Sequence, residues 1–153
     1  RRPPRDPVNA LLSLGYTLAG AEMRKAVAAG GLDPAVGFLH EPAPGREALV
    51  LDLLEPVRPG VDAFVLDLLA GEVLTPADFG NSTEEGCRLG KEGRATFYRA
   101  WSAFRSRWPP PPLTEGEAER SHEVTTLPAL ARYLVRDLRR QLLADEAQAA
   151  EAN

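Results

Sequence analysis

Residues 46–57 read REALVLDLLEPV, and this stretch decides the fold class. Its Val and Leu content would suit a buried strand, but Asp52 and Glu55 among the leucines disfavour one. The spacing predicts instead a helix that is apolar almost all round and is therefore buried on most of its surface. Because residues three apart lie on one helix face, Asp52 and Glu55 should present two carboxylates side by side.

The residues before this helix carry clear start and stop signals. Asp6-Pro7 is an N-cap followed by a proline at the first helical position, and Gly30-Gly31 is a left-handed cap, so a helix is predicted over 7–29. Asp33-Pro34 repeats the start signal and predicts a short helix, PAVGFL, which ends near His40. Two prolines and a glycine then make residues 41–45 a loop.

The residues after it continue the helical pattern. Pro56 and Pro59 should bend or break the chain. The remaining predicted elements are a helix over 60–71, a turn at 75–76, a loop over 79–86, a brief extended piece at 87–89, an amphipathic helix over 90–108 and a last helix over 126–148. We therefore expect an all-α fold of irregular helices, one domain over 1–153, with a proline-rich and acidic loop at 109–123.

Length and composition restrict the class of protein. A chain of 153 residues that is 44% hydrophobic and 26% charged suits one globular domain with its own core. The single cysteine, Cys87, fits a reducing compartment, so a cytoplasmic location is expected. No apolar stretch reaches the roughly 20 residues that span a bilayer, so no membrane partner is expected. The opening RRPPRDP reads like a linker and suggests a piece of a longer protein.

Basic residues are concentrated in two clusters, although the net charge is −4. The first lies between Gly86 and Trp108, where six basic residues stand against Glu92 alone. The second follows in the last predicted helix. A solvated helix face is the default interpretation of each, and a surface for nucleic acid is the alternative. The first cluster is Arg88, Lys91, Arg94, Arg99, Arg105 and Arg107, and the second is Arg132, Arg136, Arg139 and Arg140.

His40 stands just before the pair of acids, and together they suggest a metal site. Two ionised carboxylates on an apolar helix are costly unless a cation or hydrogen-bond donors satisfy them. A divalent metal held by His40, Asp52 and Glu55 would do so, and mostly oxygen ligands favour Mg²⁺ or Mn²⁺. The alternative is that both acids point outward with Arg46 and Arg58, while His40 only caps a helix.

Trp101, Phe104 and Trp108 recur at helical spacing. This stripe is more typical of a protein core than of a platform for stacked bases. Nucleophile elbows and glycine-rich phosphate loops are absent from the sequence. The His40 constellation is therefore the principal candidate site.

Several stretches, in order, resemble the helical C-terminal lobe of the CRISPR-associated integrase of spacer acquisition (the Cas-one family). They are DPVNALLSLGYTL, then GLDPAVGFLHEPAPGREALVLDLLEPVRPGVD, then DF and CRLGKEGRATFYRAW. The resemblance implies a metal-dependent DNA nuclease and integrase, with Mg²⁺ or Mn²⁺ held by His40, Asp52, Glu55 and a further Glu upstream of this chain. It also implies a β-rich N-terminal lobe, through which family members dimerise, and a second CRISPR adaptation protein as partner.

The chemistry that the resemblance implies is attack by a DNA 3′-hydroxyl on a phosphodiester at a CRISPR repeat. Arg46 and Arg58 would hold scissile phosphates, and the basic helix would follow the backbone of double-stranded DNA through Arg88, Lys91, Arg94 and Arg99. Two alternatives stay open. One is a helical docking module without catalysis, and the other is a metallohydrolase that does not act on DNA.

Overall fold

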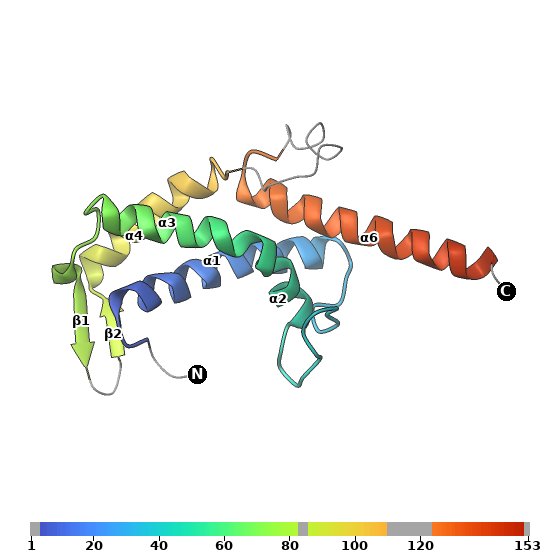
Figure 1. Ribbon diagram of the computed structural model, residues 1–153, viewed down its shortest axis with the longest axis horizontal. Helices are drawn as coiled ribbons and strands as arrows, with labels where there is room; N and C mark the ends of the chain where they lie inside the picture. The colour runs from blue at the N-terminus through green and yellow to red at the C-terminus, as the bar shows by residue number, and fades with distance from the viewer. Residues whose placement is uncertain (1–3, 83–85, 110–123, 152–153) are drawn as a thin grey trace.

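A computed structural model of the chain describes residues 4–82, 86–109 and 124–151, and these residues are predominantly helical (Figure 1). The all-α prediction is confirmed. The helices are α1 (Pro7–Ala29), α2 (Ala48–Leu54), α3 (Arg58–Ala70), α4 (Lys91–Arg105) and α6 (Leu127–Glu151), with 3-10 turns at Glu55–Val57 and Pro76–Asp78. Strands β1 (Phe79–Ser82) and β2 (Gly86–Leu89) form an antiparallel hairpin.

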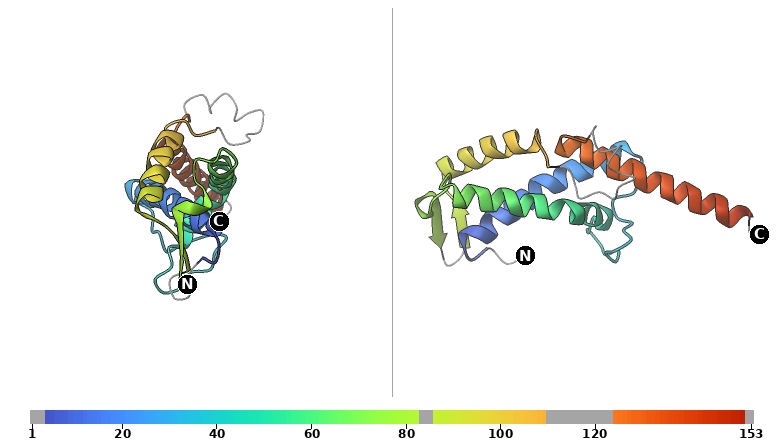
Figure 2. Two further views of the ribbon diagram at one scale, coloured as in Figure 1. Left: turned by 90° about the vertical axis from the view of Figure 1, so that its left-hand side faces the viewer. Right: turned by 45° about the horizontal axis from the view of Figure 1, so that its top comes forward.

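Helix α1 is the central element of the fold. It begins as predicted, because the Asp6 side chain accepts a hydrogen bond from the Asn9 backbone N–H at 2.9 Å and Pro7 occupies the first turn. Helices α2, α3 and α6 all pack against it (Figures 1 and 2). Its buried positions, among them Leu11, Met23 and Val27, lie in one continuous apolar core shared with these helices.

Helices α2 and α3 follow one another almost without interruption. Pro56 and Pro59 lie in the first turns of the 3-10 segment and of α3, where the missing N–H would have had no intrahelical partner. The prolines therefore change the helix from α to 3-10 and back instead of opening a loop. This arrangement places Glu55 directly after the last residue of α2.

Two local predictions are wrong. The short helix predicted for PAVGFL does not form, because the Asp33 side chain holds the Ala35 N–H at 2.9 Å in a turn and the backbone then bends at residues 38–40. The predicted loop over 79–86 begins instead with strand β1, which pairs with β2 in the register Phe79↔Leu89. Gly80 and Asn81 are poor strand formers, so pairing with the neighbouring strand outweighs their local preference.

Aromatic side chains fill the space between α3 and α4. Phe64 of α3 stacks on Phe104 with ring centroids 4.8 Å apart and meets Trp101 edge to face at 5.4 Å. Trp101 and Trp108 are 5% and 4% exposed, so the predicted core stripe is confirmed for these two residues. These rings are consequently closed to stacking with DNA bases.

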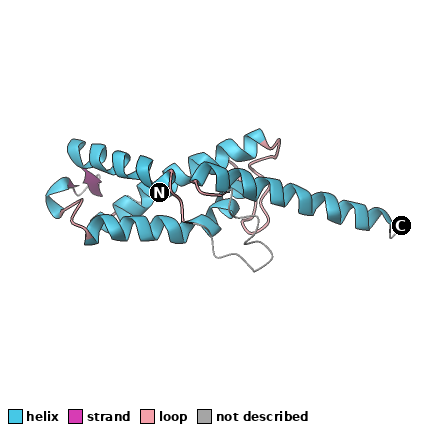
Figure 3. Ribbon diagram, turned by 90° about the horizontal axis from the view of Figure 1, so that it is seen from above, coloured by secondary structure: helices cyan, strands magenta, loops and turns pink. Residues whose placement is uncertain are grey.

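Helix α6 packs on α1 through its first half, and its second half extends beyond the rest of the molecule (Figures 1 and 3). Leu142 and Leu143 on the extending part are 48% and 61% exposed. Across residues 4–82, 86–109 and 124–151, no helix is long and apolar enough to cross a membrane. The predicted loop 109–123 lies, apart from Pro109, outside the described residues.

Candidate functional site

The segment from residue 31 to residue 47, here called the His40 loop, connects α1 to α2 and is held to both. The Leu49 N–H of α2 donates to the Pro34 carbonyl at 3.0 Å. At the end of the loop, Glu47 accepts two hydrogen bonds from Arg24 of α1, the one from Nε at 2.6 Å. Such a bidentate pair fixes orientation as well as distance. The loop therefore has a defined conformation at both of its ends.

Asp52 of α2 organises the middle of the loop. Its side chain is completely buried. Oδ2 accepts hydrogen bonds from the backbone N–H groups of Phe38 (2.5 Å) and Leu39 (3.0 Å), and Oδ1 accepts one from the His40 N–H at 3.0 Å. These three donors lie on consecutive residues, so the Asp52 carboxylate takes the place of the missing helix or strand partner for this stretch of backbone.

The His40 ring also contacts Asp52, with Nδ1 2.6 Å from Oδ1. Burial by itself would raise the pKa of Asp52, but hydrogen bonds from the Leu39 N–H, the His40 ring and the Phe38 N–H together hold that pKa below its ordinary value. Asp52 is therefore ionised at neutral pH and can only accept, so the proton between the two groups belongs to Nδ1. This leaves Nε2 as the ring nitrogen with a free lone pair whenever the imidazole is neutral.

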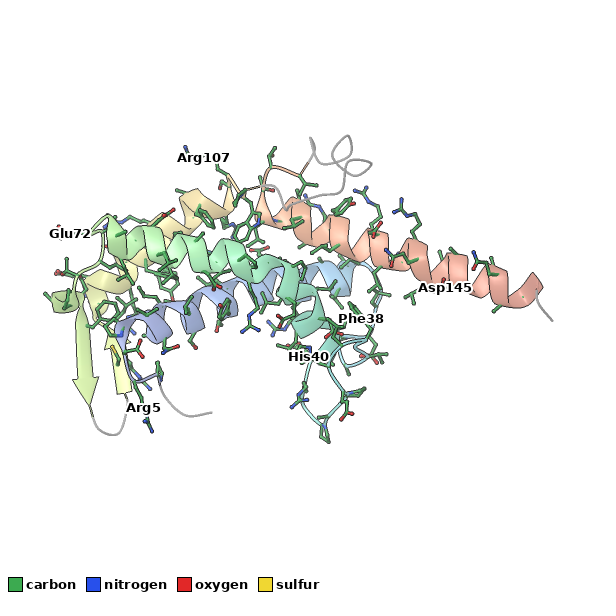
Figure 4. The ribbon with its side chains drawn as sticks, viewed as in Figure 1. Arg5, Phe38, His40, Glu72, Arg107 and Asp145 are labelled. Atoms are coloured by element: carbon green, nitrogen blue, oxygen red, sulfur yellow. The ribbon has the colours of Figure 1, made fainter. Side chains whose placement is uncertain are left out.

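Figure 4 shows His40 and Phe38 together on the loop beside α2. The His40 side chain is 36% exposed, in contrast to the fully buried carboxylate that holds it. Phe38 and Leu39, whose backbone N–H groups donate to Asp52, are 61% and 66% exposed. The loop thus presents an oriented imidazole, flanked by apolar side chains, to its surroundings.

Glu55 lies three residues after Asp52, and its carboxylate forms an ion pair with Arg58. Its Oε1 accepts a hydrogen bond from Arg58 Nη1 at 2.8 Å, and both side chains are partly exposed. The Arg58 guanidinium also lies over the ring of Tyr16, 4.7 Å from its centroid. Such stacking keeps Arg58 beside Glu55.

The structure thus brings His40 and Asp52 into direct contact, while Glu55 is paired with Arg58. Within the described ranges, no group of three or more His, Cys, Asp or Glu side chains is arranged to hold a metal ion. All four lone-pair directions of the Asp52 carboxylate have donors, namely three N–H groups and Nδ1. The shared metal site of His40, Asp52 and Glu55 therefore stays a prediction.

Sequence analysis missed Gly37, which the loop requires. A Cβ added at Gly37 would lie 2.6 Å from Asp52 Oδ2, 2.8 Å from Ala48 Cβ and 2.9 Å from the His40 carbonyl oxygen. A lone glycine inside an apolar run is a recognisable signal of close backbone approach. The ion pair between Arg24 and Glu47 was not predicted either, because the two residues are far apart in the sequence and no local pattern links them.

We expect Gly37→Ala to destabilise the protein by about 1–3 kcal/mol, the usual cost of an overpacked buried site. The change should also shift the backbone amide resonances of residues 38–40, since their acceptor must move. Gly20→Ala is the matched control, because a Cβ there meets nothing within 4 Å. Equal unfolding midpoints for the two variants in urea would show that the loop can relax around the added methyl group.

The basic residues predicted to contact DNA lie in a different part of the molecule. β2 and α4, which carry Arg88, Lys91, Arg94 and Arg99, are at one end, and the His40 loop is toward the other (Figure 1). All four side chains are exposed. Arg88 and Arg94 line a pocket of about 270 Å³ with the hydroxyl-bearing residues Ser13 and Thr17 of α1. Arg46 is exposed within the His40 loop.

Comparison with known proteins identifies the family. Residues 1–103 match the family described as CRISPR associated protein Cas1. The chain belongs to the Cas1 family. This confirms the resemblance found in the sequence, and the solved Cas1 structures match through their C-terminal portion.

The most similar relatives and structures agree with this assignment. The chain is 47% identical over 102 residues to CRISPR-associated endonuclease Cas1 3 of Thermus thermophilus (66% of this chain, 30% of the relative). It is 47% identical over 99 residues to a CRISPR-associated exonuclease Cas4/endonuclease Cas1 fusion of Geobacter sulfurreducens (63% and 17%). This Cas1 chain therefore spans about a third or less of the length of these curated relatives.

Two solved structures share its fold. A casposase bound to integration product superposes with a TM-score of 0.76 at 30% identity, covering 92% of this chain and 37% of the casposase. A Cas1 protein of Thermotoga maritima superposes with a TM-score of 0.74 at 26% identity, covering 94% and 42%. The helical architecture of this Cas1 chain is thus that of the equivalent part of both proteins.

Proposed function

We propose that this chain is the helical catalytic part of a metal-dependent DNA nuclease and integrase of CRISPR adaptation. The observation that carries the proposal is the His40 ring, whose Nδ1 is held by buried Asp52 at 2.6 Å while Nε2 remains available. A carboxylate–histidine pair of this kind is typical of metal-ligating histidines, because it fixes both tautomer and ring orientation. The endonuclease names of the relatives support the reaction class.

The types of donor present, one imidazole and a partly exposed carboxylate, suit a divalent cation, although within the described residues no three of them are arranged around one point. His40 Nε2 and the Glu55 carboxylate would hold Mg²⁺ or Mn²⁺, and Asp52 would act as a positioning residue behind His40. Two protein ligands hold such a cation weakly, so we infer that a further acid contributes, as the resemblance implies. When bound, the ion would lower the pKa of an attacking hydroxyl and neutralise charge on the phosphate.

The neighbouring arginines would bind the phosphates around the scissile bond. Arg58 neutralises Glu55 in this structure. A cation at Glu55 would take over that neutralisation and leave the Arg58 guanidinium available to a phosphate, for which its planar fork is well suited. Arg46, exposed in the His40 loop, is the second such group. Both residues would act by orienting the phosphodiester.

The proposed reaction is a transesterification on double-stranded DNA. The 3′-oxygen of one DNA end forms a bond to phosphorus at a CRISPR repeat, the bond from phosphorus to the 3′-oxygen of the target strand breaks, and the proton of the attacking hydroxyl ends on the leaving oxygen. The casposase of similar fold was solved with an integration product, which supports this substrate class. We also propose a homodimer of the whole protein, a second CRISPR adaptation protein as partner and a cytoplasmic location.

A gel assay tests the proposal and separates it from the two alternatives. A Cas1 protein carrying this chain is mixed with a labelled 3′-hydroxyl duplex, a supercoiled plasmid bearing a CRISPR repeat, and Mn²⁺ or EDTA. Strand transfer that needs Mn²⁺ supports the integrase. Metal binding without reaction on DNA would favour an unrelated metallohydrolase, and neither binding nor reaction would favour a docking module.

Arg94 and Arg99 of α4 provide a prediction about DNA binding. Changing both to Ala should weaken duplex binding to all sequences alike and lower the slope of log affinity against log salt by about 2, since each phosphate contact contributes about 0.9. Fluorescence anisotropy between 50 and 200 mM salt measures the slope. The control Lys25→Ala removes one positive charge from an exposed residue of α1 outside this surface and should lower the slope by no more than half as much. If the slope is unchanged in the α4 variant, these arginines belong to a solvated helix face and do not contact DNA.

A further inference from the structure

The second basic cluster predicted from the sequence lies around one groove. Between the end of α1 and the stretch of α6 from Arg132 to Leu143 there is a groove of about 490 Å³. Its floor comes from small or apolar residues of both helices, and its rim carries four arginines of α6. The lining residues are Ala26, Ala29, Gly30, Val135, Leu143, Arg132, Arg136, Arg139 and Arg140. The cluster is therefore not a featureless solvated face.

We propose that this arginine groove binds the phosphodiester backbone of a nucleic-acid strand, at a site separate from the His40 loop and from the basic surface of β2 and α4. The inference rests on the proposed function only for its choice of nucleic acid as the ligand. Residues 132–140 lie beyond the match to the family model, which ends at residue 103, although the solved Cas1 structure superposes over 94% of this chain.

The charges in the groove favour a polyanion. All four arginine side chains are exposed, and in the part of the chain that the structure describes Arg132, Arg136 and Arg139 form no ion pair. Arg140 pairs with Asp137, the acid on the same stretch of helix, whose other oxygen accepts a hydrogen bond from Gln141 at 2.7 Å. Asp137 is thus already paired, and the other three guanidinium groups are available to an external anion.

The spacing of the arginines fits a row of phosphates. A helix rises 1.5 Å per residue, so Arg132 to Arg140 spans about 12 Å. Successive phosphates of one strand rise about 3.4 Å along the duplex axis but lie farther apart along the winding strand, so at most about three would lie beside this row. Guanidinium forks bind phosphate oxygens in pairs, and every cation lining the groove is an arginine.

The floor of the groove permits a close approach. A Cβ at Gly30 would lie 2.4 Å from Val135 Cγ1, so α1 and α6 are already in tight contact beneath the groove. Ala26 and Ala29 add only methyl groups above this contact. Sugar and base edges of a strand can therefore rest on an apolar floor while the phosphates meet the rim. An acidic protein helix is the competing occupant, and the experiment includes it.

The test is binding of a fluorescein-labelled 20-nucleotide strand, single or in duplex, measured by anisotropy in EDTA so that no metal is needed. The triple variant Arg132→Ala, Arg136→Ala, Arg139→Ala should bind the strand at least about 10-fold more weakly. Its slope of log affinity against log salt should fall by about 2–3. The control Lys25→Ala removes one positive charge from an exposed residue that is not among the lining residues of the groove. The control should lose no more than a third of that effect.

Further arms make the result decisive. Leu143→Glu adds a carboxylate at an exposed lining position and should weaken binding without loss of core packing. Because binding is measured in EDTA, its loss in the triple variant does not depend on the proposed metal chemistry, which separates this inference from the proposed catalysis. Comparing single strand with duplex identifies which form the groove prefers. The proposal would be overturned if the triple variant and its control lost the same amount of binding affinity. It would also be overturned if polyglutamate displaced the strand at equal charge concentration.

Discussion

Replacing Asp52 by alanine should lower the free energy of unfolding by about 3–5 kcal/mol, the usual cost of removing one member of a buried charged network. The change leaves the N–H groups of Phe38, Leu39 and His40 without their acceptor, together with Nδ1 of the His40 ring. Urea unfolding followed by circular dichroism measures the loss. Glu55→Ala is the matched control, because it removes a carboxylate three residues away whose exposed pairing is worth about 1 kcal/mol or less.

The Asp52 effect should depend on pH in a defined direction. Its pKa is lower in the folded protein than in the unfolded chain, so the unfolded chain takes up a proton first as the pH falls. The stabilisation is thus present above the ordinary carboxyl pKa of about 4 and disappears as the pH falls through the lower folded value. Asp52→Ala should lack this part of the acid sensitivity. Identical pH profiles for the two proteins would mean that Asp52 does not organise the loop.

Replacing His40 by alanine, or Glu55 by glutamine, should reduce metal-dependent strand transfer by at least about 100-fold in a Cas1 protein carrying this chain. Either change removes one of the two proposed protein ligands, and loss even of a residue that only supports a ligand commonly costs 10–100-fold. Glu41→Gln is the matched control, since it neutralises an exposed carboxylate next to His40 in the same loop. Glu55→Gln should unfold at nearly the parental urea concentration, whereas His40→Ala should be less stable by about 1.5–3 kcal/mol, because it removes one of the four donors to buried Asp52.

Direct metal binding provides a second readout for the same prediction. The chain contains two histidines, so the ¹⁵N resonances of the His40 ring can be assigned by a single substitution. Titration with Mg²⁺ should move the Nε2 resonance, while Nδ1 stays protonated beside Asp52. Movement of Nδ1 instead would place the cation between His40 and Asp52, as a shared site of all three residues requires. If neither ¹⁵N resonance moves, His40 is not a metal ligand.

The sequence predicted helices well where their signals are local. Asp6 and Pro7 start α1, and the glycines after Ala29 end it, because caps act within one turn. The apolar spacing of α2 and the Trp101 stripe identified buried faces, since periodicity reflects burial directly. The strand Phe79–Ser82 was missed because its pairing partner, and not its own residues, stabilises it.

The candidate site could be predicted only in part. The nearness of His40 and Asp52 followed from an acid on an apolar helix and a histidine shortly before it. The role of Asp52 did not follow, because it depends on where three backbone N–H groups point, and no side-chain pattern encodes that direction. The sequence left two roles open for Glu55, a metal ligand or the ion-pair partner of Arg58. A helix brings residues three apart together in either case.

The contacts that shape the His40 loop are short in sequence. Asp52 reaches its three backbone donors across 12 to 14 residues, so closing this loop costs little chain entropy. Such a segment can acquire its shape early in folding, before the long-range pairing of α1 with α6 is complete. Helix α2, by contrast, buries Leu49, Val50 and Leu53 in the core that it shares with α1. Residues 33–58 could therefore be exchanged between related proteins only together with the α1 positions that contact α2, Arg24 among them.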